Sequence, residues 1–149
     1  MARLFLLALI LVPALAQGVR TGLTPGAMEA LLKAGSCRYE RVEEGGRVYF
    51  HLRLAGLRAV LFLQDCREGS CESLLLYAGF STDNPPSLER VNEWNREKRF
   101  SRAYLDEEGD PVLEADLDLA GGVADGAIRA FLDLFEENLR AFAAWIGWE

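Results

Sequence analysis

Three cysteines and a single histidine carry the side chains best suited to metal binding or nucleophilic chemistry: Cys37, His51, Cys66 and Cys71. The gap of four residues between Cys66 and Cys71 is compatible with zinc ligation, so a site made of all four side chains is one interpretation. The other is a disulfide, because two cysteines that flank a short polar loop commonly form one in an oxidising compartment. We expect the disulfide, with Cys37 left as a free, small hydrophobic residue.

Acidic residues are the second group with possible chemistry. They cluster at Asp106, Glu107, Glu108, Asp110, Glu114, Asp116 and Asp118. The spaced aspartate loop that binds calcium is missing, and carboxylates two residues apart on a strand point in parallel instead of converging. A nucleophile formed by Cys37 and His51 would need a third group to orient it, and no motif supplies one. We therefore predict no catalytic residue, no cofactor and no metal ion.

The charge balance also bears on possible partners. The 149-residue chain has 16 Lys and Arg against 23 Asp and Glu, which gives a formal net charge of −7. A protein that binds nucleic acid needs a basic face to neutralise phosphates, so we expect no nucleic-acid partner. The length is that of one domain with a substantial hydrophobic core.

The N-terminus has the three-part pattern of a secretory signal peptide. Arg3 precedes an apolar run over residues 4–15, and Ala14-Leu15-Ala16 fits the small-x-small cleavage pattern. The run is shorter than the roughly 20 residues of a membrane-spanning helix. We expect a signal peptide over residues 1–16, cleavage after Ala16 and a mature single domain over residues 17–149. That domain would be exported, periplasmic or extracellular, and without a stable membrane anchor.

Turn residues and hydrophobic periodicity predict the elements of this domain. Thr24 caps a first helix that begins at Pro25 and ends before Gly35. Four strand-like runs follow, at residues 38–42, 48–54, 59–64 and 73–80, and strict alternation of apolar and polar residues along the second predicts a half-buried strand with one wet face. Ser87 caps a second helix, and a hairpin follows with strands near residues 103–105 and 113–119.

The last helix has the strongest periodicity in the chain, and Asp125 is its expected cap. Its apolar residues follow at steps of four and three: Ile128, Leu132, Phe135, Leu139, Phe142 and Ile146. So broad an apolar face must cover a sheet. We predict an α+β fold in which helices pack on one face of an antiparallel β-sheet, in the order α-β-β-β-β-α-β-β-α.

Four longer motifs carry a resemblance to a known family. They are LYAGF (76–80), VNEWNR (91–96), RFSRAYLD (99–106) and GDPVLEADL (109–117). In these motifs the chain resembles the YbjN family of bacterial sensory transduction regulators, and the Cys66–Cys71 pair resembles that of exported members. The resemblance implies a fold similar to type III secretion chaperones, small domains that bind other proteins and often dimerise. It implies no catalytic residues.

The candidate docking residues lie on the second helix and the strand after it: Asn92, Trp94, Asn95, Arg102 and Tyr104. An aromatic ring with two amides beside it is suited to recognising a peptide. The alternative is that Trp94 packs the helix against the sheet while the amides bond to nearby backbone, and we favour this alternative.

A charge ladder is expected beside these residues. Three arginines, at positions 96, 99 and 102, come close in sequence to the strand that carries Glu114, Asp116 and Asp118. Opposite charges on adjacent strands generally form solvated pairs that contribute about 0.2–1 kcal/mol each.

The sequence as a whole favours an exported, non-catalytic protein-binding module, chaperone-like or regulatory. The aromatic stripe of the last helix ends in Trp145, Ile146 and Trp148, more apolar surface than one small domain is expected to bury. The expected partner is another polypeptide or a second copy of the chain. The alternative is an envelope sensor that binds a small ligand or a metal through the acidic strand or the cysteines and histidine.

Overall fold

The computed structural model describes residues 18–148, so the predicted signal peptide and its cleavage site lie outside the described residues. The helices are α1 (Pro25–Ala34), α2 (Leu88–Glu97) and α3 (Asp125–Trp145). The strands are β1 (Val19–Arg20), β2 (Arg38–Glu44), β3 (Arg47–Leu54), β4 (Leu57–Arg67), β5 (Ser70–Gly79), β6 (Arg102–Leu105), β7 (Pro111–Asp118) and β8 (Val123–Ala124). The predicted α+β fold and its element order are confirmed, with β1 and β8 as additions.

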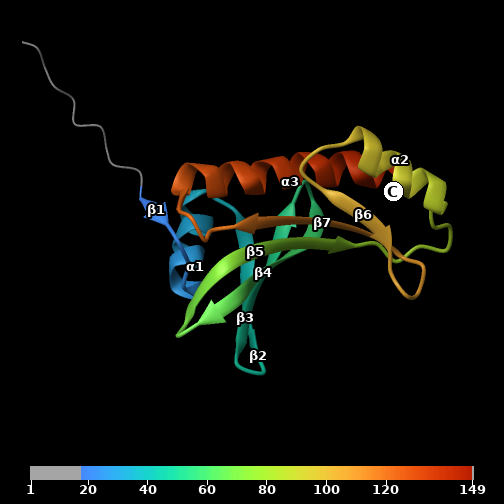
Figure 1. The fold of residues 1–149 in the computed structure, drawn as a ribbon. Helices are drawn as coiled ribbons and strands as arrows, with labels where there is room; N and C mark the ends of the chain where they lie inside the picture. The colour runs from blue at the N-terminus through green and yellow to red at the C-terminus, as the bar shows by residue number, and fades with distance from the viewer. Residues whose placement is uncertain (1–17, 149) are drawn as a thin grey trace, which may run out of the picture.

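The six longer strands form one antiparallel sheet in the order β2-β3-β4-β5-β7-β6. Consecutive hairpins build the first four strands, and the sheet is completed by β7 beside β5 and by the short edge strand β6. The two-residue strands β1 and β8 pair with each other and join the start of the described chain to the start of α3. Figure 1 shows α3 running along the sheet, with α2 beside its C-terminal part.

The core forms where the helices meet one face of this sheet. The alternation expected over residues 48–54 places Phe50, Leu52 and Leu54 in the core, while His51 is exposed on the other face of the sheet. All three helices contribute side chains to the same hydrophobic cluster, among them Met28, Trp94 and Phe142. The predicted packing of helices on one face is therefore confirmed.

The helix caps follow the sequence signals in two cases and depart from them in one. Thr24 and Ser87 accept backbone N–H groups of the first turns of α1 and α2. The prediction that Asp125 caps the last helix is wrong: Ala124 occupies the cap position and Asp125 is the first helical residue. Its carboxylate instead accepts hydrogen bonds from Arg20, at 2.7 and 3.0 Å, and so joins the helix to β1.

Candidate functional site

The sheet face opposite the core, called the open face here, carries two rows of neighbouring side chains. By the strand register, one row runs through Tyr49, Phe62, Leu75 and Asp116, and the other through His51, Val60, Tyr77, Glu114 and Arg102. The aromatic and aliphatic members are half-buried by each other, with the rings of Tyr49 and Phe62 5.6 Å apart between centroids. No helix of the described residues covers these rows.

Glu114 holds a charged network at the β6 end of the open face. Its Oε2 accepts hydrogen bonds from Arg102 Nε and Nη2, at 2.9 and 2.6 Å, and its Oε1 accepts the hydroxyl of Tyr104 at 2.8 Å. The same guanidinium donates to Asp116 at 2.7 Å. Glu114 is only 7% exposed, and both oxygens of its buried carboxylate accept hydrogen bonds from two of the predicted docking residues, Arg102 and Tyr104.

The prediction that three arginines form a solvated charge ladder with the acidic strand is therefore wrong. Only Arg102 reaches the acidic strand, since Arg96 pairs with Glu93 and Glu97 on its own helix. Glu114 lies on the open face as alternation requires, but the side chains of β6 cover it. The sequence pattern does not reveal this burial, because burial depends on the register that sets Arg102 opposite Glu114.

The network shifts the ionisation of Tyr104. Burial, together with the hydrogen bond to the Glu114 carboxylate, raises the pKa of Tyr104 from 10.0 to about 12. The folded state thus favours the protonated phenol, and the stability it adds is complete below pH 10 and lost as pH rises toward about 12.

In an absorbance titration of tyrosinate, we expect a step near pH 12 that Tyr104→Phe abolishes and Tyr49→Phe leaves in place. Ionisation of Tyr104 at the usual pKa of a tyrosine would contradict the network.

Asn95 fastens α2 to the edge of the sheet. Its amide nitrogen donates to Ala103 O at 2.9 Å and its oxygen accepts Ala103 N–H at 2.8 Å, so one side chain satisfies both outward-facing backbone groups of that residue on β6. Asn95 therefore bonds to nearby backbone, as the interpretation that we favoured for the two amides predicts. Asn92, one turn back, is exposed.

We expect Asn95→Ala to lower the free energy of unfolding by about 1–2 kcal/mol, because two backbone groups of an edge strand lose their partner. Asn92→Ala is the matched control and should change it by less than about 0.5 kcal/mol. Urea unfolding of the two variants measures the difference. Equal values for both would contradict the role given to Asn95.

Trp94 belongs to the core, as the favoured packing interpretation predicts. Its side chain is fully buried, its ring lies against Phe142 and Trp145 at centroid distances of 5.0 and 5.8 Å, and its Nε1 donates to Ser101 Oγ at 3.3 Å. Arg90 then stacks on the outer side of Trp145, 3.4 Å from the ring centroid. Trp94 therefore offers no surface to a partner, whereas Arg102 and Tyr104 are exposed.

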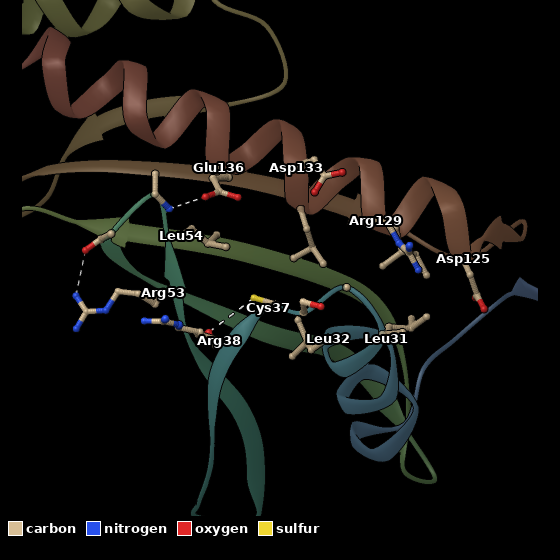
Figure 2. Close-up of a pocket in the computed structure, with 17 residues that line it drawn as sticks. Leu31, Leu32, Cys37, Arg38, Arg53, Leu54, Asp125, Arg129, Asp133 and Glu136 are labelled. Atoms are coloured by element: carbon tan, nitrogen blue, oxygen red, sulfur yellow. Dashed lines mark hydrogen bonds between the residues drawn. The ribbon is translucent and has the colours of Figure 1, made fainter.

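A pocket on the helix side of the molecule contains the free thiol of Cys37 (Figure 2). It has a volume of about 520 Å³ and lies between the end of α1, the β3–β4 turn and α3. Glu136 of α3 is anchored there by accepting the backbone N–H of Ala55 at 2.6 Å. Burial, and secondarily the Glu136 carboxylate, raise the pKa of the Cys37 thiol, which opposes formation of a nucleophilic thiolate.

The four residues considered for a zinc site are not brought together. Cys37 lines the pocket of Figure 2, His51 lies on the open face, and Cys66 and Cys71 face each other near the β4–β5 turn with their sulfurs at disulfide-bonding distance. Among residues 18–148 no cluster of three or more His, Cys, Asp or Glu side chains is placed to hold a metal ion. The described helices include none that is long and apolar enough to cross a membrane.

Comparison with known proteins decides the family. Residues 24–148 match the family model described as "Putative bacterial sensory transduction regulator". The chain belongs to the YbjN family. No curated protein matches it. A solved structure, of an uncharacterised protein from Methanothermobacter thermautotrophicus, superposes on this YbjN chain with a TM-score of 0.54 and 11% identity, covering 83% of this chain and 96% of that one. At that identity the likeness shows the fold alone. The likeness to type III secretion chaperones stays a prediction.

Proposed function

We propose that this YbjN-family chain is an exported, non-catalytic regulatory module that acts by binding another polypeptide through the open face of its sheet. Membership of a family of regulators is consistent with a regulatory or binding module. The observation that carries the proposal is the open face itself. Tyr49, Phe62 and Leu75 form a continuous apolar row there, and the charged network of Glu114 lies beside it.

Such a surface suits a protein partner better than a small molecule. It combines half-buried aromatic rings with exposed hydrogen-bonding groups of Arg102 and Tyr104, the mixture of residue types enriched at protein interfaces. The pairing of Arg102 and Tyr104 with Glu114 fixes their side chains before binding, which lowers the entropy lost on association.

Export is supported by the N-terminal pattern and by the position of the cysteines. The N-terminal pattern is the apolar run over residues 4–15 and the Ala14-Leu15-Ala16 sequence before Gln17. A disulfide between Cys66 and Cys71 would fix the β4–β5 hairpin, and an exported protein would keep it oxidised.

Two measurements on protein recovered from its native host test this part of the proposal. We expect the intact mass of a chain that begins at Gln17. We also expect one reactive thiol per chain when the protein is denatured without reduction, and three thiols after reduction. A mass that includes residues 1–16, or three thiols before reduction, would contradict export with an oxidised hairpin. One metal ion retained per chain would favour the envelope sensor instead.

Crosslinking in the native host, followed by mass spectrometry of what the mature protein captures, tests the binding function. We expect one recurrent heterologous polypeptide with the wild type, lost on Phe62→Glu in the open face. The matched control is Leu88→Glu, since Leu88 is 73% exposed on α2 and away from that face. Circular dichroism confirms that both variants fold. Self-crosslinks only, or equal capture by both variants, would contradict the proposal.

A further inference from the structure

β6 is shorter than β7, so the end of β7 is paired with β5 on one side and has no strand beside it on the β6 side among the described residues. β7 spans Pro111–Asp118, whereas the register of β6 ends where Arg102 meets Glu114. On that side no strand of the described residues pairs with residues 115–118. Figure 1 shows β6 alongside only part of β7, with α3 running along the sheet.

The unpaired stretch points backbone hydrogen-bonding groups outward. The backbone N–H and C=O of Ala103 point away from β7, toward Asn95. Because the direction of these groups alternates along a strand, the backbone groups of Arg102 point toward β7, where they meet those of its register partner Glu114. Hydrogen bonds from Phe80 N to Pro111 O and from Leu119 N to Glu72 O show that the odd-numbered residues of β7 point their backbone N–H and C=O groups toward β5. By alternation, the N–H and C=O groups of Asp116 and Asp118 face the open edge.

An apolar groove adjoins this edge. Its floor and walls come from Ala115 and Leu117 of β7 and from one side of α3, chiefly Phe131 and Leu134, and it has a volume of about 410 Å³. Phe100 stands at its β6 end with 59% of its surface exposed. The backbone of Phe100 has a φ of 63°, a conformation unusual for a bulky residue, and Asn138 holds the preceding carbonyl, Arg99 O, at 3.0 Å.

Charge decides what kind of strand fits. A strand added antiparallel to residues 115–118 would point one set of side chains past Ala115 and Leu117 into the groove and the other set beside Asp116 and Asp118 on the open face. Both aspartates are exposed, and Arg102 offsets one of them. A second copy of the chain, edge to edge, would bring four of these carboxylates together, so the edge disfavours a homodimer through β7.

We propose that the free edge of β7, with its apolar groove, binds an extended peptide segment of alternating basic and apolar residues as an added antiparallel strand. This inference rests on the proposed function and specifies its partner. The segment forms main-chain hydrogen bonds with Asp116 and Asp118, inserts apolar side chains against Phe131 and Leu134, and places Lys or Arg beside the two carboxylates. The apolar row of the open face ends at Asp116, so the bound strand continues that surface.

A synthetic peptide of sequence Lys-Val-Lys-Leu-Lys-Ile tests the chemistry, with Glu-Val-Glu-Leu-Glu-Ile as the opposite-charge control. Fluorescence anisotropy should show at least tenfold tighter binding of the basic peptide to the wild type. Amide hydrogen exchange should slow at Asp116 and Asp118 and stay unchanged at the other sheet edge, β2. No binding of the basic peptide, or binding without protection of these two amides, would overturn the proposal.

A charge-reversed variant keeps the test independent of folding defects. Asp116→Lys with Asp118→Lys should reverse the preference, losing at least tenfold for the basic peptide and gaining for the acidic one. Glu107→Lys with Glu108→Lys, two exposed carboxylates in the β6–β7 turn, is the matched control and should leave the preference unchanged. An unaltered preference in the Asp116 and Asp118 variant would overturn the proposal.

The two proposals fail separately. Loss of cellular capture on Phe62→Glu, with no binding of the basic peptide, keeps the binding module and rejects the edge strand. Binding of the peptide at the β7 edge, with no heterologous polypeptide captured in the host, supports the edge chemistry and rejects the proposed function.

Discussion

Trp94→Ala should lower the free energy of unfolding by about 3–5 kcal/mol, the usual cost of removing a large aromatic side chain from a packed core. The ring is fully buried and contacts two other aromatic residues, Phe142 and Trp145, so its removal leaves a cavity where α2 meets α3. Urea unfolding followed by circular dichroism measures the loss.

Trp94→Phe separates this packing role from recognition by the indole. It keeps most of the volume, gives up the hydrogen bond to Ser101, and should cost clearly less than the alanine variant. It should also leave capture of the partner unchanged. Loss of capture by a stably folded Trp94→Phe protein would return Trp94 to the docking surface.

Glu114→Lys should be the most damaging single charge change on the open face, at about 2–4 kcal/mol. The new ammonium group would lie in a buried position beside the Arg102 guanidinium, with the bonds to Arg102 and Tyr104 both lost. The cost stays below the upper range for a fully buried ion pair because the Arg102 side chain is 57% exposed and can turn to water.

Asp116→Lys is the control for that change. It makes the same charge reversal two residues along the same strand, at an exposed position, and should cost less than about 1 kcal/mol. Thermal unfolding of both variants at equal ionic strength gives the comparison. Similar losses for the two would mean that the network around Glu114 contributes little to the fold.

Local signals in the sequence were sufficient for most of the architecture. Thr24 and Ser87 determine where helices begin because their side chains bond to the first turn, and the alternation of β3 separates core from open face residue by residue. The stripe of α3 predicted both its length and its role as cover for the sheet. Each of these effects operates within a few residues of the chain.

The features that were missed depend on pairs of residues far apart in the sequence. The pairing of Asp125 with Arg20 spans 105 residues, and it replaced the expected cap. The burial of Glu114 required the β6–β7 register, and the free edge of β7 required the knowledge that β6 ends early. No local pattern contains that information.

The structure gives little support to the alternative function, an envelope sensor that binds a small ligand or a metal. The acidic residues of β7 do not converge, since Glu114 is committed to Arg102 and Tyr104 and Asp116 to Arg102. The pocket beside Cys37 has room for a small ligand, with Arg129 and Asp133 at its wall (Figure 2). Its charges are mixed, and no single ligand chemistry is favoured there.

Site-specific photo-crosslinking tests the central claim most directly. A benzoylphenylalanine in place of Phe62 reports contacts of the open face in the native host, and the same group in place of Leu88 reports contacts of the exposed side of α2. We expect one heterologous polypeptide joined at position 62 and absent at position 88. The same products at both positions, or self-crosslinks alone at position 62, would contradict the claim.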